Sequence, residues 1–122
     1  MHSMLVGNSF PLSLIRRRVV IEPRPVEAFR QCLRTSCVRS FWGHANTLAA
    51  AGTFAGTDLT PRKERPAVLL SGDGFPMLEG QVFTECWILS PSYREGFRPA
   101  VGEEVAGEDI ENWQVLHMEW EG

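Results

Sequence analysis

Turn-forming residues divide the apolar part of this chain into short segments, which limits it to a small mixed fold. Glycine, asparagine and aspartate recur between the apolar runs, as in Gly7-Asn8-Ser9 and Gly72-Asp73-Gly74, where they predict turns. No run approaches the roughly eighteen apolar residues that a membrane-spanning helix needs, so we expect no membrane partner. The sequence does not begin with a basic segment followed by a long apolar stretch, and we therefore expect a cytoplasmic rather than a secreted protein.

The hydrophobic pattern predicts an α+β fold in a single domain that spans residues 1–122. Strands are predicted at residues 4–7, 19–22, 37–42, 67–70, 81–89 and 114–120. Helices are predicted at residues 26–34 and 44–55, and residues 103–112 are interpreted as a short acidic helix. Residues 1–3 are expected to be disordered, and residues 57–66 and 90–96 to be exposed loops. Because strands and helices do not alternate regularly, we predict a mixed sheet flanked by helices.

The charged residues are distributed unevenly along the chain. The formal net charge is −3, which by itself disfavours a nucleic-acid partner. Residues 1–66 nevertheless carry ten basic and four acidic side chains, whereas residues 67–122 carry two basic and eleven acidic ones. All the basic side chains except Lys63 are arginines, which suit bidentate contacts with phosphate. A biased genome composition would also enrich arginine, so the asymmetry is only a reason to look for a local anion site.

The three cysteines do not form a metal-binding pattern. Four residues separate Cys32 from Cys37, and Cys86 has no close partner in the sequence. An odd number of cysteines without a secretory signal indicates reduced thiols. The sequence also lacks the usual glycine-rich nucleotide motifs and the zinc-protease motif. We therefore predict neither a metal site nor a cofactor.

His44 is the residue best suited to catalysis. It follows Gly43 at the start of a predicted helix, where backbone N–H groups and the helix dipole create an anion site. Asn46 and Thr47 would add side-chain donors in the same turn. A phosphate bound here favours the imidazolium form, so His44 could act as a general acid when ligand is present. The alternative is a histidine that only caps the helix.

The same predicted helix is rich in small side chains. Three of them, Ala45, Ala49 and Gly52, share one face with Leu48. Side chains of this size allow close backbone approach, so this face is expected to pack against a sheet or a second helix.

Arg94 and Glu95 form a second candidate site, in a predicted loop that follows an apolar strand. Loops at strand ends often display catalytic side chains. Glu95 could accept a proton or orient a hydroxyl, and Arg94 could hold a phosphate. The alternative is a solvated surface ion pair that contributes little energy. The run of residues 16–18, three arginines, is interpreted as a solvated edge because consecutive side chains point in different directions.

The order of these features along the chain resembles a known family. A strand ends in Gly7-Asn8-Ser9, a Gly43-His44 pair opens an alanine-rich helix, Arg65 precedes a strand, and Arg94-Glu95-Gly96 follows another strand. In this order and spacing the chain is similar to the small viral and prophage ring nucleases that antagonise type III CRISPR systems, and to their relatives inside CRISPR loci. The resemblance covers residues 4–120.

The resemblance implies a homodimer that encloses cyclic tetra-adenylate at its interface and cuts the ring without metal to linear di-adenylate with a 2′,3′-cyclic phosphate end. In this reaction a ribose 2′-hydroxyl attacks the adjacent phosphorus, and the protein orients the attack and protonates the departing 5′-oxygen. His44 matches the family's catalytic histidine, and Glu95 matches its catalytic glutamate. Asn8 matches an asparagine that contacts the ligand, and Arg65 a basic residue of the binding loop. The predicted ligand contacts also include Ser9, Gly43, Asn46, Thr47 and Ser92.

The chain departs from the family at one position. The family usually places an arginine four residues before the glycine of an Arg-x-x-Glu-Gly signature, and Ser92 stands there in this sequence. Either Arg94 reaches the same phosphate from a shifted loop, or stabilisation of the transition state is weaker. A substrate other than cyclic tetra-adenylate is a third reading.

Two other functions are consistent with the sequence. The Ser92 departure allows a protein that sequesters a cyclic oligonucleotide without cutting it. The basic N-terminal half allows a DNA-binding viral accessory protein. We favour a small cyclic ligand over a long nucleic acid, because four phosphates need only a few well-placed donors and the acidic C-terminal half repels a duplex.

Overall fold

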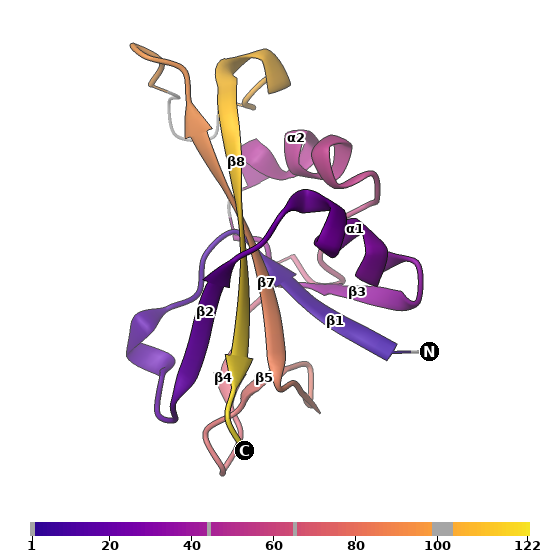
Figure 1. Ribbon diagram of the computed structural model, residues 1–122, viewed down its shortest axis with the longest axis vertical. Coiled ribbons are helices and arrows are strands. Elements are labelled where there is room, and N and C mark those ends of the chain that lie inside the picture. Colours follow the sequence, from indigo (N-terminus) through magenta and orange to yellow (C-terminus); the bar gives the residue numbers. More distant parts are fainter. Residues whose placement is uncertain (1, 44, 65, 99–103) are drawn as a thin grey trace.

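The computed structural model describes residues 2–43, 45–64, 66–98 and 104–122. Two sheets and two helices make up the fold (Figure 1). The larger sheet has the strand order β2-β8-β7-β1-β3 and comprises β1 (His2–Gly7), β2 (Val19–Pro23), β3 (Ser36–Ser40), β7 (Glu85–Tyr93) and β8 (Ile110–Trp120). The smaller sheet comprises β4 (Leu69–Leu70), β5 (Pro76–Leu78) and β6 (Gln81–Val82). The helices are α1 (Val26–Leu33) and α2 (Ala45–Ala55).

The larger sheet mixes parallel and antiparallel strands, which confirms the predicted α+β class. Strand β1 runs parallel to both of its neighbours, β3 and β7. Strand β8 runs antiparallel to β7 on one side and to β2 on the other. The carboxyl ends of β1, β3 and the central part of β7 therefore point in the same direction.

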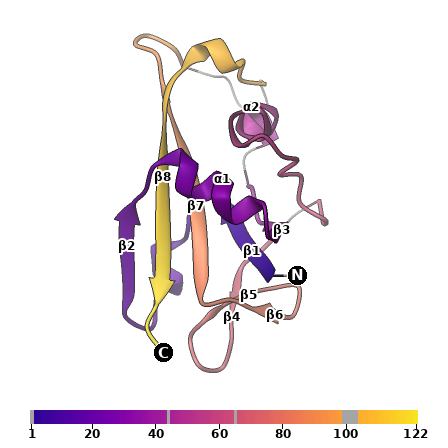
Figure 2. The same ribbon diagram turned by 45° about the vertical axis from the view of Figure 1, so that its right-hand side comes forward.

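Side chains alternate between the two faces of this sheet and form two apolar clusters, the first on the face that carries the helices and the second on the opposite face. Met4 and Val6 of β1 pack on the helix side with Phe29 and Trp87, whereas Leu5 joins the opposite cluster. Both helices cover the same face, as Figure 2 shows, and the small sheet and the segment after β1 cover the other face. The molecule thus has three layers, with α1 and α2 on one side of the larger sheet, and the small sheet and the segment that contains the 3₁₀ helix Leu12–Leu14 on the other. Cys86 is fully buried in the second cluster, and this burial raises the pKa of its thiol.

Helix α2 packs through a different face from the one expected. Thr47, Ala51 and Ala55 point into the core at helical spacing, whereas Ala45 and Ala49 are exposed. Gly52 instead lies close to the turn that ends the same helix, since a Cβ there would lie 3.1 Å from the Thr57 carbonyl oxygen. As predicted, the helix ends at Gly56, whose φ of 77° is readily adopted by glycine.

Several expected boundaries are wrong. His2 and Ser3 belong to β1 rather than to a disordered end, and the expected strand over residues 81–89 is divided into β6 and β7. The division follows from Phe83, which is buried in the second cluster as the chain passes from one sheet to the other. Residues 107–109 form a single 3₁₀ turn in place of the predicted acidic helix.

The largest difference is the length of β7. Residues 90–93 were expected to form a loop, but β7 continues through Tyr93 by pairing with β8. The last pair between β1 and β7 joins Gly7 to Ile88, so beyond this point β7 has a single neighbour. Pro91 can occupy a strand there because the side without a neighbour requires no backbone N–H donor.

The arginine run at residues 16–18 forms a solvated edge only in part, because Arg16 and Arg18 are exposed whereas Arg17 is half-buried. The Arg17 guanidinium donates to the Glu121 carbonyl from Nε (3.1 Å) and Nη2 (2.9 Å), and to the Asp73 carbonyl from Nη1 (3.0 Å). It also lies 4.3 Å from the centre of the Phe75 ring. Arg17 therefore connects the C-terminal end to the small sheet.

No helix in the described ranges is long and apolar enough to cross a membrane.

Candidate functional site

The candidate site begins at the edge of the larger sheet where β1 and β3 end. These strands are paired in parallel up to Val6 and Ser40, so the chain leaves both of them at the same edge. Ligands of sheets with parallel strands commonly bind outside these carboxyl ends. The Phe41 N–H continues the ladder with a 2.9 Å hydrogen bond to the Val6 carbonyl, and the chain then runs through Trp42 and Gly43 towards α2.

Asn8 connects the two segments that leave this edge. Its Oδ1 accepts a 2.9 Å hydrogen bond from the backbone N–H of Gly43. The amide oxygen is thereby engaged, and the amide NH₂ group forms no hydrogen bond to any described residue. Asn8 thus fixes the residue that precedes His44, and the two donors of its amide nitrogen have no partner among the described residues. His44 itself lies outside the described residues.

A buried hydrogen bond between side chains holds the first turn of α2 against the core. The Trp42 indole N–H donates a 3.1 Å hydrogen bond to Oγ1 of Thr47, and both side chains are buried. We expected Thr47 to offer a donor to a bound anion, but its 3% exposure makes it a structural contact. The backbone carbonyl of the half-buried Asn46 accepts a 2.6 Å hydrogen bond from Val105, which ties the segment before β8 to this turn. Ser9 and Gly43 are exposed at the same edge.

A two-stranded arm extends from the sheet beside this edge. Strands β7 and β8 remain paired from Ser90–Gln114 to Tyr93–Ile110, beyond the last contact of β7 with β1, and form the upper part of Figure 1. Trp113 at the base of the arm stacks on Phe54 with ring centres 5.0 Å apart, and lies 6.5 Å from Trp42. The arm is therefore packed against α2 at its base.

Arg94 and Glu95 lie at the far end of this arm. The Arg94 Nε donates to the Asp109 carboxylate at 2.8 Å, and the Arg94 N–H donates to the Asp109 carbonyl at 3.0 Å. A turn from Arg94 to Phe97 follows. It is closed by a 3.1 Å hydrogen bond from the Phe97 N–H to the Arg94 carbonyl, and it contains Gly96 with a φ of 83°. Glu95 is exposed in this turn, and Ser92 is exposed on β7.

The structure brings together only part of the predicted set. Asn8 and Gly43 are in contact, and Asn46 and Thr47 follow in the next turn. Within the described ranges, no hydrogen bond or ion pair links Glu95 or Ser92 to that group. Gly7 pairs with Ile88, and Tyr93 lies five residues further along β7, which corresponds to about 17 Å of strand. Arg65 lies outside the described residues.

Asp109 and Trp113 were missed as parts of this region. Asp109 was assigned to an acidic helix, although it is the acidic partner of Arg94. Trp113 was left outside the closing strand, although its side chain joins the arm to α2. No local pattern indicates either residue, because the polar residues 111, 112 and 114 interrupt the alternation, and the pairing of Asp109 with Arg94 depends on the register between β7 and β8. No group of three or more His, Cys, Asp or Glu within the described ranges is arranged to hold a metal ion.

Replacing Asn8 by alanine is expected to lower the free energy of unfolding by about 0.5–1.5 kcal/mol, because the Gly43 N–H loses its acceptor. Urea denaturation measures this difference. Asn8→Asp keeps an acceptor oxygen and is expected to unfold close to wild type. Ser9→Ala, an exposed neighbour, serves as the control. An Asn8→Ala midpoint equal to that of Ser9→Ala would show that the contact does not stabilise the fold.

Comparison with known proteins supports the fold assignment. No protein-family model and no curated protein sequence matches the chain. Among solved structures, the chain is similar to B116 of Sulfolobus turreted icosahedral virus, with a TM-score of 0.57 and 16% sequence identity. The similarity covers 98% of this chain and 99% of that one. The chain therefore shares its α+β fold, over nearly its whole length, with a viral protein.

Proposed function

We propose that this protein is a metal-independent ring nuclease that cleaves cyclic tetra-adenylate to linear di-adenylate with a 2′,3′-cyclic phosphate end. This activity would switch off type III CRISPR signalling in the cytoplasm of the cell that makes the ring. The observation that carries the proposal is the Asn8–Gly43 hydrogen bond, which fixes the residue before His44 at the carboxyl edge of the sheet. The likeness to a viral protein is consistent with an antagonist of host immunity.

The proposed reaction uses the 2′-hydroxyl of the substrate as its nucleophile. His44 would protonate the departing 5′-oxygen, and such general acid catalysis contributes about 10²–10⁴-fold. The two donors on the Asn8 amide nitrogen, with the backbone N–H groups that open α2, would hold the phosphate. Arg65 is proposed to add a positive charge to the same anion.

The proposal places the ligand between two copies of the chain. Glu95 lies at the end of the arm, about 17 Å or more along β7 from the level of Gly7. A partner subunit related by a two-fold axis would allow each arm to reach over the sheet edge of the other copy. A ring with four repeats also matches two-fold symmetry, because opposite linkages meet identical groups.

The test is chromatography of cyclic tri-, tetra- and hexa-adenylate after incubation with the purified protein and a chelator. We expect cyclic tetra-adenylate to be converted to di-adenylate and the other rings to be converted more slowly. The chelator is expected to leave the rate unchanged. Recovery of all three rings intact after long incubation would contradict the proposed activity.

One observation favours sequestration of the ring as the second candidate. The family arginine is replaced by Ser92, and the nearby Arg94 is already paired with Asp109 at 2.8 Å. The Asp109 carboxylate offsets the positive charge of Arg94, which weakens the stabilisation that this arginine could give to negative charge in a transition state. Stoichiometric binding of cyclic tetra-adenylate with full recovery of the intact ring would select this function.

A further inference from the structure

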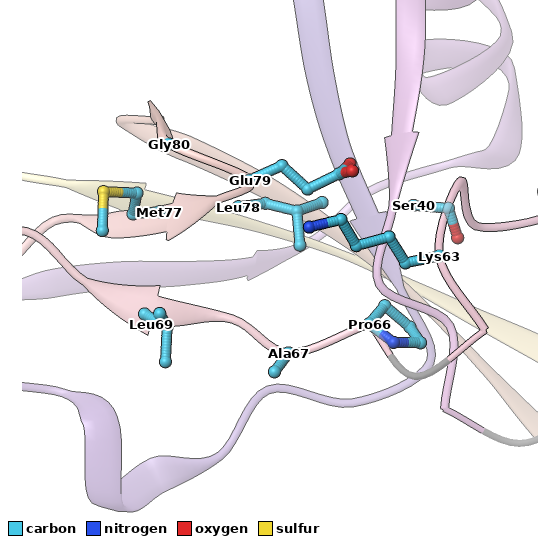
Figure 3. A pocket seen from close by; sticks show the side chains of 9 residues that line it. All are labelled: Ser40, Lys63, Pro66, Ala67, Leu69, Met77, Leu78, Glu79 and Gly80. Atoms are coloured by element: carbon cyan, nitrogen blue, oxygen red, sulfur yellow. The ribbon is translucent and has the colours of Figure 1, made fainter.

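A pocket of about 240 Å³ lies between the small sheet and the segment that leads into it (Figure 3). Its lining does not include Asn8, Gly43 or the first turn of α2. Part of its wall is apolar and comprises Leu69, Met77 and Leu78, while polar groups of the lining contribute nearly as much of the surface. Ser40, the last residue of β3, lies at one end of the pocket, and Gly43 follows it three residues later in the sequence. Its size is below the roughly 300–1,000 Å³ of pockets for drug-sized ligands, so the pocket has room for a single ring system at most.

Lys63 supplies the cationic group of this pocket. Figure 3 shows its side chain extending between β5 and the segment at Pro66–Ala67, with the ammonium group near Leu78. Lys63 forms no ion pair or hydrogen bond with any described residue. Lys63 is exposed, and an ammonium group beside a pocket with both apolar and polar walls suits a ligand that combines a flat ring with a negative charge.

Glu79 gives the rim of the pocket an acceptor in a fixed position. Its Oε2 pairs with Nη2 of Arg39 at 3.1 Å, and its other carboxylate oxygen has no hydrogen bond to a described residue. Glu79 has a φ of 49°, and no other described non-glycine residue has a positive φ. Glu79 and Gly80, which has a φ of 82°, are the two residues of the turn between β5 and β6, a hairpin turn in which both central residues adopt a positive φ. Arg39 also donates to Gln81 at 2.6 Å, so the turn is held on both sides.

We propose that this pocket binds one adenine base of the nucleotide ligand, with Lys63 contacting the phosphate attached to it. The nucleotide class rests on the proposed function, whereas the pocket stands on its own geometry. The apolar walls would hold the faces of the base, and the unpaired Glu79 oxygen would accept a hydrogen bond from the exocyclic amino group. Uracil has no such amino group, so the pocket would discriminate against uridine nucleotides. Arg39, which pairs with the other oxygen of Glu79, acts here as a positioning residue.

Nuclear magnetic resonance of the methionine methyl groups tests this directly. Met77 lines the pocket, whereas Met4 and Met118 are buried in the two clusters and serve as internal controls. Adenosine 5′-monophosphate is expected to shift the Met77 signal in a saturable way and to leave the other two unchanged. Uridine 5′-monophosphate and inorganic phosphate are expected to cause at most a small shift at the same concentration.

Two variants make the test specific. Lys63→Ala is expected to weaken adenosine 5′-monophosphate binding at least fivefold, while Arg62→Ala, an exposed cation outside the pocket lining, stays within twofold of wild type. Unchanged Met4 and Met118 signals in each variant show that the fold is intact.

The outcomes separate the pocket from the proposed activity. Ring cleavage with no Met77 shift, and with an unchanged KM in Lys63→Ala, would overturn the pocket assignment and leave the ring nuclease proposal standing. An equal Met77 shift with uridine 5′-monophosphate would overturn the adenine assignment. A selective shift with adenosine 5′-monophosphate in a protein that leaves the ring uncut would support the pocket and contradict the ring nuclease proposal.

Discussion

Replacement of His44 by alanine is expected to slow cleavage of cyclic tetra-adenylate by about 10²–10⁴-fold, because the departing 5′-oxygen would lose its proton donor. The dissociation constant for the ring is expected to change much less, since the proposed phosphate contacts come from Asn8 and the backbone of α2. Single-turnover cleavage measures the first quantity, and equilibrium binding to the uncut ring by the variant measures the second.

A matched histidine variant controls for this measurement. His2 is exposed on the first position of β1, so His2→Ala is expected to cleave at the wild-type rate. Full turnover by His44→Ala would remove His44 from the role of general acid. Loss of both binding and cleavage would show that His44 mainly binds the ring.

Replacement of Gly7 by alanine is expected to destabilise the protein by about 1–3 kcal/mol, the usual cost of overpacking a core. A Cβ at this position would lie 2.4 Å from two carbons of the Phe41 ring, which is buried and 6% exposed. The ring lies edge-on to Phe10 at 6.3 Å, and Phe41 leads directly into Trp42 and Gly43. Relief of the clash therefore displaces the segment that carries the catalytic group.

Urea denaturation and ring binding measure the two consequences of Gly7→Ala. The midpoint of unfolding is expected to fall, and affinity for the ring is expected to fall with it. Gly72→Ala is the matched control, because a Cβ at Gly72 meets no atom within 4 Å and its φ is not positive. Equal midpoints for the two variants would contradict this account of the sheet edge.

The sequence predicted the elements whose patterns are local. Pro25 and the apolar spacing after it located α1, and Gly56 located the end of α2. Alternation near the end of the chain located the second half of β8. In each case the signal lies in residues that are close in the sequence, so propensity and turn chemistry were sufficient.

The elements that depend on distant partners could not be predicted in this way. Pro91 and its serine neighbours favour a loop, and only pairing with β8 makes them part of β7. The face of α2 that packs was also misassigned, because small side chains occur on both faces and Trp42 decides which one turns inward.

The residues of the candidate site likewise fall into those that the sequence could predict and those that depend on distant partners. The sequence order identified Asn8 and Gly43, which the structure joins by a hydrogen bond. The length of the arm, which carries Glu95 away from that pair, could not be foreseen while residues 90–96 were interpreted as a loop. The pairing of Arg94 with Asp109 likewise depends on the register between β7 and β8.

The central claim is that the protein cuts cyclic tetra-adenylate by attack of the 2′-hydroxyl of the ring. Mass spectrometry of the first products, formed with chelator in ¹⁸O-labelled water, tests it most directly. Attack by the 2′-hydroxyl adds no water, so the account predicts di-adenylate with half the mass of the ring and no ¹⁸O. Products that are heavier by one labelled water from the earliest time, or a ring that stays intact, would contradict the account.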